Sequence, residues 1–195
     1  MSEYFLDKFG ERISGPWTDI RFHLPLLFNR ACAVEKVQVM ECGVRGANST
    51  LAFLAAAEKT GGHVWSYDIE EPDLPEGEKE KWEETGLWTF TKSDSAWIPE
   101  DKLPTEPIDI LFLDTDHNIY QQLLELQRHV PLVKPGGIVF IHDVAWASPE
   151  MKGHVPGTFG PVAWALDEYC RDDDREPDRW WYAFPGSYGM GVLNV

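Results

Sequence analysis

The stretch VQVMECGVRGANSTLAFLAAAEK, residues 37–59, decides the fold. It opens with a short apolar run that stops at Gly43 and continues into a segment rich in Ala and Leu at helical spacing. A strand, a glycine turn and a helix in this order form the first unit of an α/β sheet. We expect Asn48 or Ser49 to cap the helix, because their side chains can accept hydrogen bonds from its first N–H groups.

Further segments repeat this alternation of strand and helix. Apolar runs predict strands at residues 63–68, 87–92, 108–114 and 138–142, helical spacing predicts helices at residues 118–133 and 162–170, and the glycines of residues 134–137 predict a turn. Alternation of this kind is typical of a parallel sheet with helices on both faces.

The end of the chain departs from this pattern. Residues 179–184 and 190–195 have the pattern of two strands joined by a short glycine-containing loop. A parallel crossover needs a dozen or more residues, so these strands form a hairpin and the last one runs antiparallel. We therefore predict an α/β fold of about seven strands, mostly parallel, with an antiparallel C-terminal strand and helices on both faces.

Length and charge restrict the possible functions. The 195 residues predict one domain, with residues 1–36 as a helical segment that covers the substrate site and residues 37–195 as the core. The formal charge is -16, which argues against nucleic acid and anionic membrane partners because both require cationic contacts. Three cysteines without Cys-x-x-Cys spacing, no signal peptide and no membrane-spanning stretch predict a cytoplasmic location.

The first loop indicates which ligand the sheet binds, since ligands of such sheets lie at the carboxyl ends of the strands. The loop lacks the Gly-x-Gly-x-x-Gly pattern that holds a dinucleotide pyrophosphate, although Gly43 and Gly46 allow a tight turn and a close backbone approach. Glu41 directly precedes the turn, where its carboxylate would repel a phosphate. It suits an ammonium group instead, such as that of the amino-acid end of S-adenosylmethionine. A nicotinamide oxidoreductase is accordingly disfavoured.

The next two strand ends fit the rest of such a nucleoside. Asp68 is placed to accept hydrogen bonds from both ribose hydroxyls. Asp94 and Ser95, within the Ser93-Asp94-Ser95 segment, are placed to bind the adenine amino group. With Asn48 and Ser49 at the start of the helix, these residues complete the predicted cofactor site.

The order of these motifs resembles class I S-adenosylmethionine-dependent methyltransferases. Glu-x-Gly with Ser-Thr, then Tyr-Asp, Ser-Asp-Ser, Phe-Leu-Asp, Lys-Pro-Gly-Gly and a terminal hairpin follow one another over residues 37–195. The similarity is greatest to small-molecule O-methyltransferases of the catechol and macrolide-sugar types. It implies a Rossmann-like methyltransferase fold, S-adenosylmethionine as cofactor and a homodimer. The loop departs from the catechol-type pattern at one point. Its second glycine, Gly46, comes one residue earlier than in that pattern, and Ala47 stands where the catechol type often has glycine.

A second site is predicted beside the first. Adjacent strand ends lie about 5 Å apart, so Asp114, which also borders the cofactor site, can converge with His142 and Asp143. This set of ligands suits Mg²⁺ or another divalent cation, which would lower the pKa of a bound substrate hydroxyl. His117 follows at the start of a helix, and its pKa near neutrality suits a general base.

The resemblance implies the same roles for these residues. Macrolide-sugar methyltransferases carry Asp-x-x-His here, with the Asp on the metal and the His as base, and these positions match Asp114 and His117. An acidic pair of metal ligands in that family falls on His142 and Asp143, so His142 is a departure from its pattern.

Three functions remain after these arguments. The first is methyl transfer to a hydroxyl of a small molecule, such as a sugar, a catechol or another natural product. The second is a non-catalytic S-adenosylmethionine-binding accessory protein on the same fold, and the third is the disfavoured oxidoreductase. Residues 13–23 and 144–160 are expected to wall the substrate pocket, with Trp17, Trp146 and Phe159 as candidate aromatic contacts.

Overall fold

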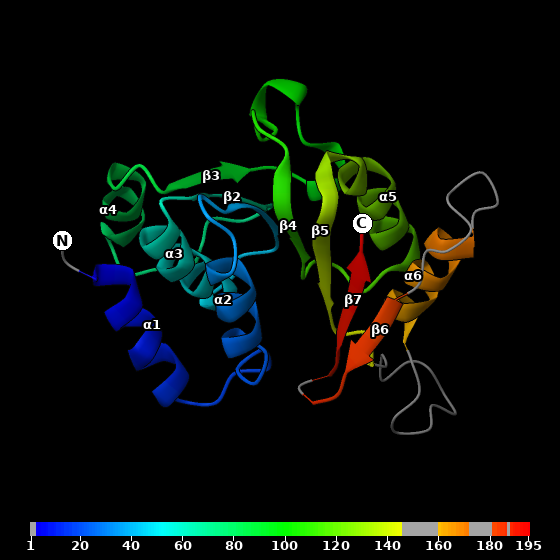
Figure 1. The fold of residues 1–195 in the computed structure, drawn as a ribbon, viewed down its shortest axis with the longest axis horizontal. Coiled ribbons are helices and arrows are strands. Elements are labelled where there is room, and N and C mark those ends of the chain that lie inside the picture. The colour runs from blue at the N-terminus through cyan, green and yellow to red at the C-terminus, as the bar shows by residue number, and fades with distance from the viewer. Residues whose placement is uncertain (1–2, 146–159, 172–180, 187) are drawn as a thin grey trace.

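A computed structural model describes residues 3–145, 160–171, 181–186 and 188–195. Its centre is a seven-stranded sheet of order β3-β2-β1-β4-β5-β7-β6 (Figure 1). The strands are β1 (Gln38–Cys42), β2 (His63–Asp68), β3 (Trp88–Lys92), β4 (Ile108–Leu113), β5 (Val133–His142), β6 (Trp181–Phe184) and β7 (Met190–Asn194). The pairs among β1 to β5 are parallel, and β7 runs antiparallel to both β5 and β6. The predicted fold class, including the reversed last strand, is confirmed.

Helices cover both faces of the sheet (Figure 1). They are α1 (Tyr4–Ser14), α2 (Leu24–Cys32), α3 (Asn48–Thr60), α4 (Glu78–Glu84), α5 (Ile119–His129) and α6 (Pro161–Arg171), with short 3-10 turns at Ser95–Trp97, Glu100–Lys102 and Val130–Leu132. Successive residues of a strand point to opposite faces. Thus Val39 packs in a core with α1, α2 and α3, whereas Met40 packs in a second core with α5 and α6.

Residues 134–137 correct one sequence expectation. They were predicted to form a turn before the fifth strand, but they lie within β5, which begins at Val133. The glycines are accommodated by an irregularity, because Val133 pairs with Ile108 while Ile138 already pairs with Ile110. Gly136 has φ +82 there, a conformation that glycine adopts without strain.

The N-terminal segment packs beside the glycine loop that follows β1. α1 and α2 both lie against α3, and the connection between α1 and α2 reaches the carboxyl edge of the sheet. The division of the chain at residue 36 stays a prediction. Within the described parts of the chain, the helices are too short or too polar to cross a membrane.

Candidate active site

The glycine loop brings two strand ends into direct contact. Gly43 has φ +92, and a Cβ built on it would lie 2.0 Å from the carbonyl oxygen of Asp114. Its N–H donates to the carbonyl of Tyr67 at 2.8 Å, and the N–H of Asp114 donates to the carbonyl of Cys42 at 2.9 Å. Only glycine fits at position 43, and this packing sets the loop against the end of β4.

The start of α3 differs from the sequence expectation. The N-cap residue is Ala47, in a left-handed conformation with φ 55, and it makes no side-chain capping bond. Asn48 and Ser49 are the first helical residues rather than caps. Ala47 occupies the position where the catechol-type pattern has glycine, and it adopts the backbone conformation that glycine would adopt more readily. The first turn of α3 therefore has no side-chain cap.

Glu41 lies below the site instead of in it. Its carboxylate is fully buried and accepts hydrogen bonds from Ser49 Oγ at 2.6 Å, Thr50 Oγ1 at 2.8 Å and Ser66 Oγ at 2.6 Å. Burial raises the pKa of Glu41 to about 7 despite these bonds. The structure therefore does not bring the Glu41 carboxylate to the surface where a ligand's ammonium group would lie. Its visible role is to tie β1 to α3 and β2.

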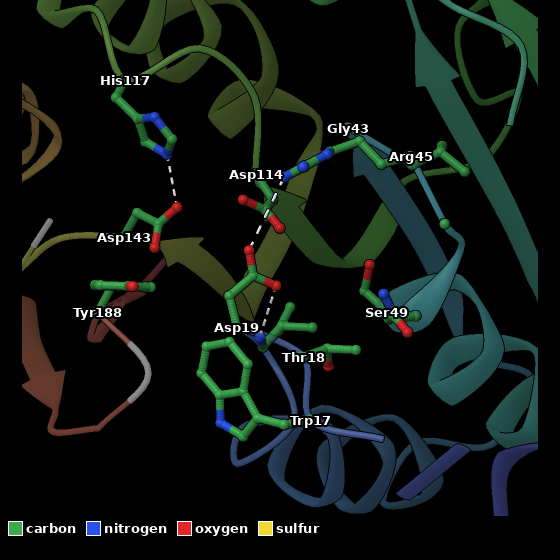
Figure 2. A pocket seen from close by; sticks show the side chains of 14 residues that line it. Trp17, Thr18, Asp19, Gly43, Arg45, Ser49, Asp114, His117, Asp143 and Tyr188 are labelled. Carbon is green, nitrogen blue, oxygen red and sulfur yellow. Dashed lines mark hydrogen bonds and ion pairs between the residues drawn. The ribbon is translucent and has the colours of Figure 1, made fainter. Parts of the chain in front are cut away.

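Two adjoining cavities open at the carboxyl edge of the sheet and share Gly43, Arg45 and Asp114. The first cavity, of about 500 Å³, is shown in Figure 2. It is lined by Trp17, Thr18, Asp19, Ile20, Gly43, Val44, Arg45, Gly46, Asn48, Ser49, Asp114, His117, Asp143 and Tyr188. The second, of about 400 Å³, is lined by Gly43, Arg45, Tyr67, Asp68, Ile69, Glu70, Asp94, Ser95, Asp114, Thr115, Asp116 and Gln121.

The second cavity collects the predicted nucleoside residues. Asp68 Oδ2 accepts hydrogen bonds from the N–H groups of Val44 at 2.7 Å and Arg45 at 3.2 Å, so this carboxylate also holds the glycine loop. Asp94 caps the 3-10 turn that contains Ser95. Asp68, Asp94 and Ser95 thus share one cavity, as the nucleoside hypothesis requires, while Gly46, Asn48 and Ser49 line the first cavity.

A buried carboxylate beneath the second cavity was missed by the sequence reasoning. Glu125, on α5, is fully buried and accepts hydrogen bonds from Ser95 Oγ, from Thr115 Oγ1 at 2.9 Å and from Gln121 Nε2 at 3.1 Å. Burial raises its pKa. The only sequence signal for this role is an acidic residue among the apolar positions of an amphipathic helix.

His117 and Asp143 form a close pair at the wall of the first cavity (Figure 2). His117 Nε2 lies 2.6 Å from Asp143 Oδ2, and this hydrogen bond raises the pKa of His117. Burial alone would raise the pKa of Asp143, but the bonds from His117 and His142 outweigh it and lower that pKa to about 2. The hydrogen bond therefore favours the protonated imidazole of His117 beside the Asp143 carboxylate.

Asp114, His117 and Asp143 can hold a metal ion, because each offers one ligand atom and these atoms lie within 4.8 Å of one another. This group differs in one member from the predicted set of Asp114, His142 and Asp143, which stays a prediction. His142 is buried behind the group, with Nδ1 at 3.3 Å from Asp114 Oδ1 and from Asp143 Oδ1. Burial lowers its pKa, but the two carboxylates outweigh burial and raise it to about 10, so His142 acts as a charged partner of the two carboxylates.

The walls of the first cavity were predicted in part. Trp17 lines it, as the interpretation of residues 13–23 indicated, and it comes with Asp19, which no motif marked. Tyr188, from the loop between β6 and β7, also lines it and was missed because the hairpin was assigned no role beyond the sheet. Trp146 and Phe159 lie outside the described residues.

A seven-stranded sheet with a reversed last strand and two cavities over its first loop defines the class I methyltransferase fold. A family model for the methyltransferase domain matches residues 40–144. The chain therefore belongs to the methyltransferase-domain family. A search of curated proteins finds no match.

Solved structures share this fold at low sequence identity. The S-adenosylhomocysteine-bound methyltransferase PaMTH1 of Podospora anserina matches with a TM-score of 0.64 and 16% identity, over 97% of this chain and 87% of that chain. The O-methyltransferase TomG of Streptomyces achromogenes, solved with S-adenosylmethionine and involved in tomaymycin synthesis, matches with a TM-score of 0.63 and 16% identity, over 100% and 91%. An O-methyltransferase of Bacillus cereus matches with a TM-score of 0.62 and 15% identity, over 100% and 92%.

Proposed function

We propose that this protein transfers the methyl group of S-adenosylmethionine to a hydroxyl of a small molecule. The observation that carries the proposal is the pair of adjoining cavities that share Gly43, Arg45 and Asp114. The second cavity suits the adenosine, with Asp68 toward the ribose and Asp94 toward the adenine. The first suits the methionine portion and the acceptor. Two similar structures, PaMTH1 and TomG, were solved with S-adenosylhomocysteine and S-adenosylmethionine, which supports this choice of ligand.

The reaction is an in-line displacement at the methyl carbon. The acceptor oxygen forms the new C–O bond, the C–S bond breaks, and the products are a methyl ether and S-adenosylhomocysteine. Because the sulfonium is already activated, the protein has to align the two reactants and remove one proton. Because both cavities share Asp114, we expect the reacting methyl group to lie near this residue, next to the His117–Asp143 pair.

His117 is the proposed general base. It lies at the cavity wall, and Asp143 orients its ring through the 2.6 Å hydrogen bond. The base must be neutral to accept the acceptor proton, and the imidazolium that results is then stabilised by the Asp143 carboxylate. This arrangement uses the carboxylate as an orienting and charge-stabilising partner of the imidazole.

As an alternative to the base role, the Asp114, His117 and Asp143 group would hold a divalent cation, because its oxygen and imidazole ligands match Mg²⁺ or a transition metal; His117 would then be a ligand and not the base. When bound there, the cation would lower the pKa of a coordinated acceptor hydroxyl. Asp114 and Asp143 would supply the negative charge of the site.

A hydroxylated small molecule fits the first cavity, whose volume of about 500 Å³ lies within the range of small-ligand pockets.

Two measurements test the proposal. Calorimetric titration with S-adenosylhomocysteine is expected to give one binding site per chain, and titration with NAD is expected to give none. Wild type is then incubated with S-adenosylmethionine and a panel of sugars, catechols and polyketide alcohols, with release of S-adenosylhomocysteine as the readout. His117→Ala is expected to lower kcat about 100-fold or more while its affinity for S-adenosylhomocysteine stays near that of wild type.

His63→Ala is the matched control, because His63 lies outside the residues that line either cavity. It is expected to keep wild-type turnover. Equal turnover in His117→Ala and wild type would refute the base, and binding of NAD in place of S-adenosylhomocysteine would refute the cofactor. Binding of the cofactor without turnover on any acceptor would favour the accessory protein.

A further inference from the structure

The amino-acid tail of the proposed cofactor needs a carboxylate partner other than Glu41. The tail carries an ammonium group, and Glu41 is fully buried with its oxygens occupied by three hydroxyls. Among the described residues that line the first cavity, three others carry carboxylates: Asp19, Asp114 and Asp143. The question is which of these is placed to receive a new cation.

Two of the three are already committed to imidazoles. Asp143 binds His117 at 2.6 Å, and Asp114 lies 3.3 Å from Nδ1 of the buried His142. Both also belong to the group that can hold a metal ion. The ammonium group of a ligand would have to compete there with the imidazoles that already contact these two carboxylates.

Asp19 differs from these two. It lies between α1 and α2, and Figure 2 shows its carboxylate pointing toward Asp114 and the guanidinium of Arg45. Its Oδ1 accepts the N–H of Ile20 at 3.0 Å, and its Oδ2 lies 3.9 Å from Nη1 of Arg45. The side chain retains 42% of its exposure. The carboxylate is therefore oriented by its own loop and remains accessible to a ligand.

The contact between Asp19 and Arg45 is a weak one. Its distance is at the limit of an ion pair, and the Arg45 side chain is 83% exposed. Exposed pairs of this kind contribute little to stability, so exchanging them for charges of a ligand costs little. Arg45 also lines both cavities, which places its guanidinium beside the boundary where the tail would join the nucleoside.

The cavity wall opposite Asp19 contains a second element that suits the carboxylate of the ligand's amino-acid tail. α3 begins beside Arg45, spans 13 residues, and has no side-chain cap at its N-terminus. Helix N-termini carry a partial positive charge and unpaired N–H groups. An amino-acid zwitterion in this cavity would therefore meet negative charge at Asp19 and positive charge at Arg45 and the start of α3.

We propose that Asp19 and Arg45 bind the amino-acid tail, with Asp19 accepting hydrogen bonds from the ammonium group and Arg45 donating to the carboxylate. The two residues exchange their mutual contact for the two charges of the ligand. This inference rests on the proposed cofactor and assigns its tail to a loop of the N-terminal segment.

The test compares two ligands that share the adenosine and the sulfur but differ in the amino-acid tail. S-Adenosylhomocysteine carries the zwitterion, whereas 5′-methylthioadenosine has the adenosine and the sulfur but no amino acid. Both are titrated calorimetrically into wild type, Asp19→Asn, Arg45→Gln and the control Asp101→Asn, an exposed acid outside both cavities. Circular dichroism and thermal unfolding establish that each variant is folded.

Asp19→Asn and Arg45→Gln are each expected to weaken S-adenosylhomocysteine binding about tenfold and to leave 5′-methylthioadenosine binding unchanged. Asp101→Asn is expected to bind both ligands like wild type. Unchanged S-adenosylhomocysteine affinity in Asp19→Asn would overturn the inference and leave the proposed function standing, as would an equal loss for both ligands. Failure of wild type to bind either ligand would instead remove the proposed function itself, and the inference with it.

Discussion

Gly43 and Asp114 lie so close together that a single methyl group added at Gly43 would overlap the backbone of Asp114. A Cβ at Gly43 would lie 2.0 Å from the Asp114 carbonyl oxygen and 2.7 Å from its carbonyl carbon. The first loop and the end of β4 are therefore packed backbone to backbone. This contact brings the glycine loop and the His117–Asp143 pair to one edge of the sheet.

Gly43→Ala is expected to destabilise the protein by roughly 2–5 kcal/mol, because it adds a steric overlap to an unfavourable positive φ. Gly61→Ala is the matched control: Gly61 has φ +74, and a Cβ there would meet nothing within 4 Å. It is expected to cost about 1 kcal/mol, from the backbone conformation alone. Urea denaturation measures both variants. Equal losses would contradict the close approach.

The buried Glu41 predicts a pH dependence of stability. Its pKa is raised from 4.5 to about 7, so the folded protein binds this proton more tightly than the unfolded chain does. The contribution of protonated Glu41 is fully present below about pH 4.5 and is lost as the pH rises through about 7. The loss amounts to ~3 kcal/mol. Glu41→Gln is expected to remove this slope in urea denaturations across the window, and identical slopes in both proteins would contradict the assignment.

Glu125 is expected to support the second cavity through Ser95 and Thr115. Glu125→Ala removes their buried acceptor and is expected to cost ~2–3 kcal/mol of stability and to weaken S-adenosylhomocysteine binding. Glu125→Gln keeps a side-chain oxygen and is expected to recover most of both. Glu106→Ala, at an exposed position outside the cavities, serves as control in thermal unfolding and calorimetry. Wild-type affinity in Glu125→Ala would argue against this positioning role.

A bound divalent cation is expected to stabilise the protein through Asp114, His117 and Asp143. Added Mg²⁺ is expected to raise the Tm of chelator-treated wild type by roughly 2–4 °C. Asp143→Ala is expected to abolish the shift, whereas Asp116→Ala, at the exposed neighbouring acid outside this group, keeps it. Differential scanning calorimetry gives the readout without dependence on turnover. A shift that persists in Asp143→Ala would place the ion elsewhere.

The order of the strands and of helices α3, α5 and α6 could be predicted because apolar runs, glycine turns and helical spacing are local properties of the chain. The cavity-lining positions Asp68, Asp94 and Asp114 followed from the rule that strand ends share one edge. The local sequence pattern does not show which residues a side chain contacts in the folded protein. Glu41 lies at a strand end as predicted, yet Ser66 of β2 and the first turn of α3 enclose its carboxylate.

Tertiary contacts also explain the other differences between the sequence predictions and the structure. His117 and His142 are both adjacent to the acidic group, and only the three-dimensional structure shows that His117 faces the cavity while His142 lies buried behind it. Asp19 and Glu125 belong to elements without a recognisable motif, so their roles depend on tertiary packing. The glycines of residues 134–137 indicate a turn locally, but pairing with β4 extends β5 through them.

The central claim is that the two adjoining cavities hold one molecule of S-adenosylmethionine across Gly43. A crystal structure with S-adenosylhomocysteine tests it most directly. The account predicts the ribose hydroxyls at Asp68, the adenine beside Asp94 and Ser95, and the amino-acid tail in the cavity lined by Asp19 and Ser49. An adenosine bound away from Asp68 and Asp94 would contradict it.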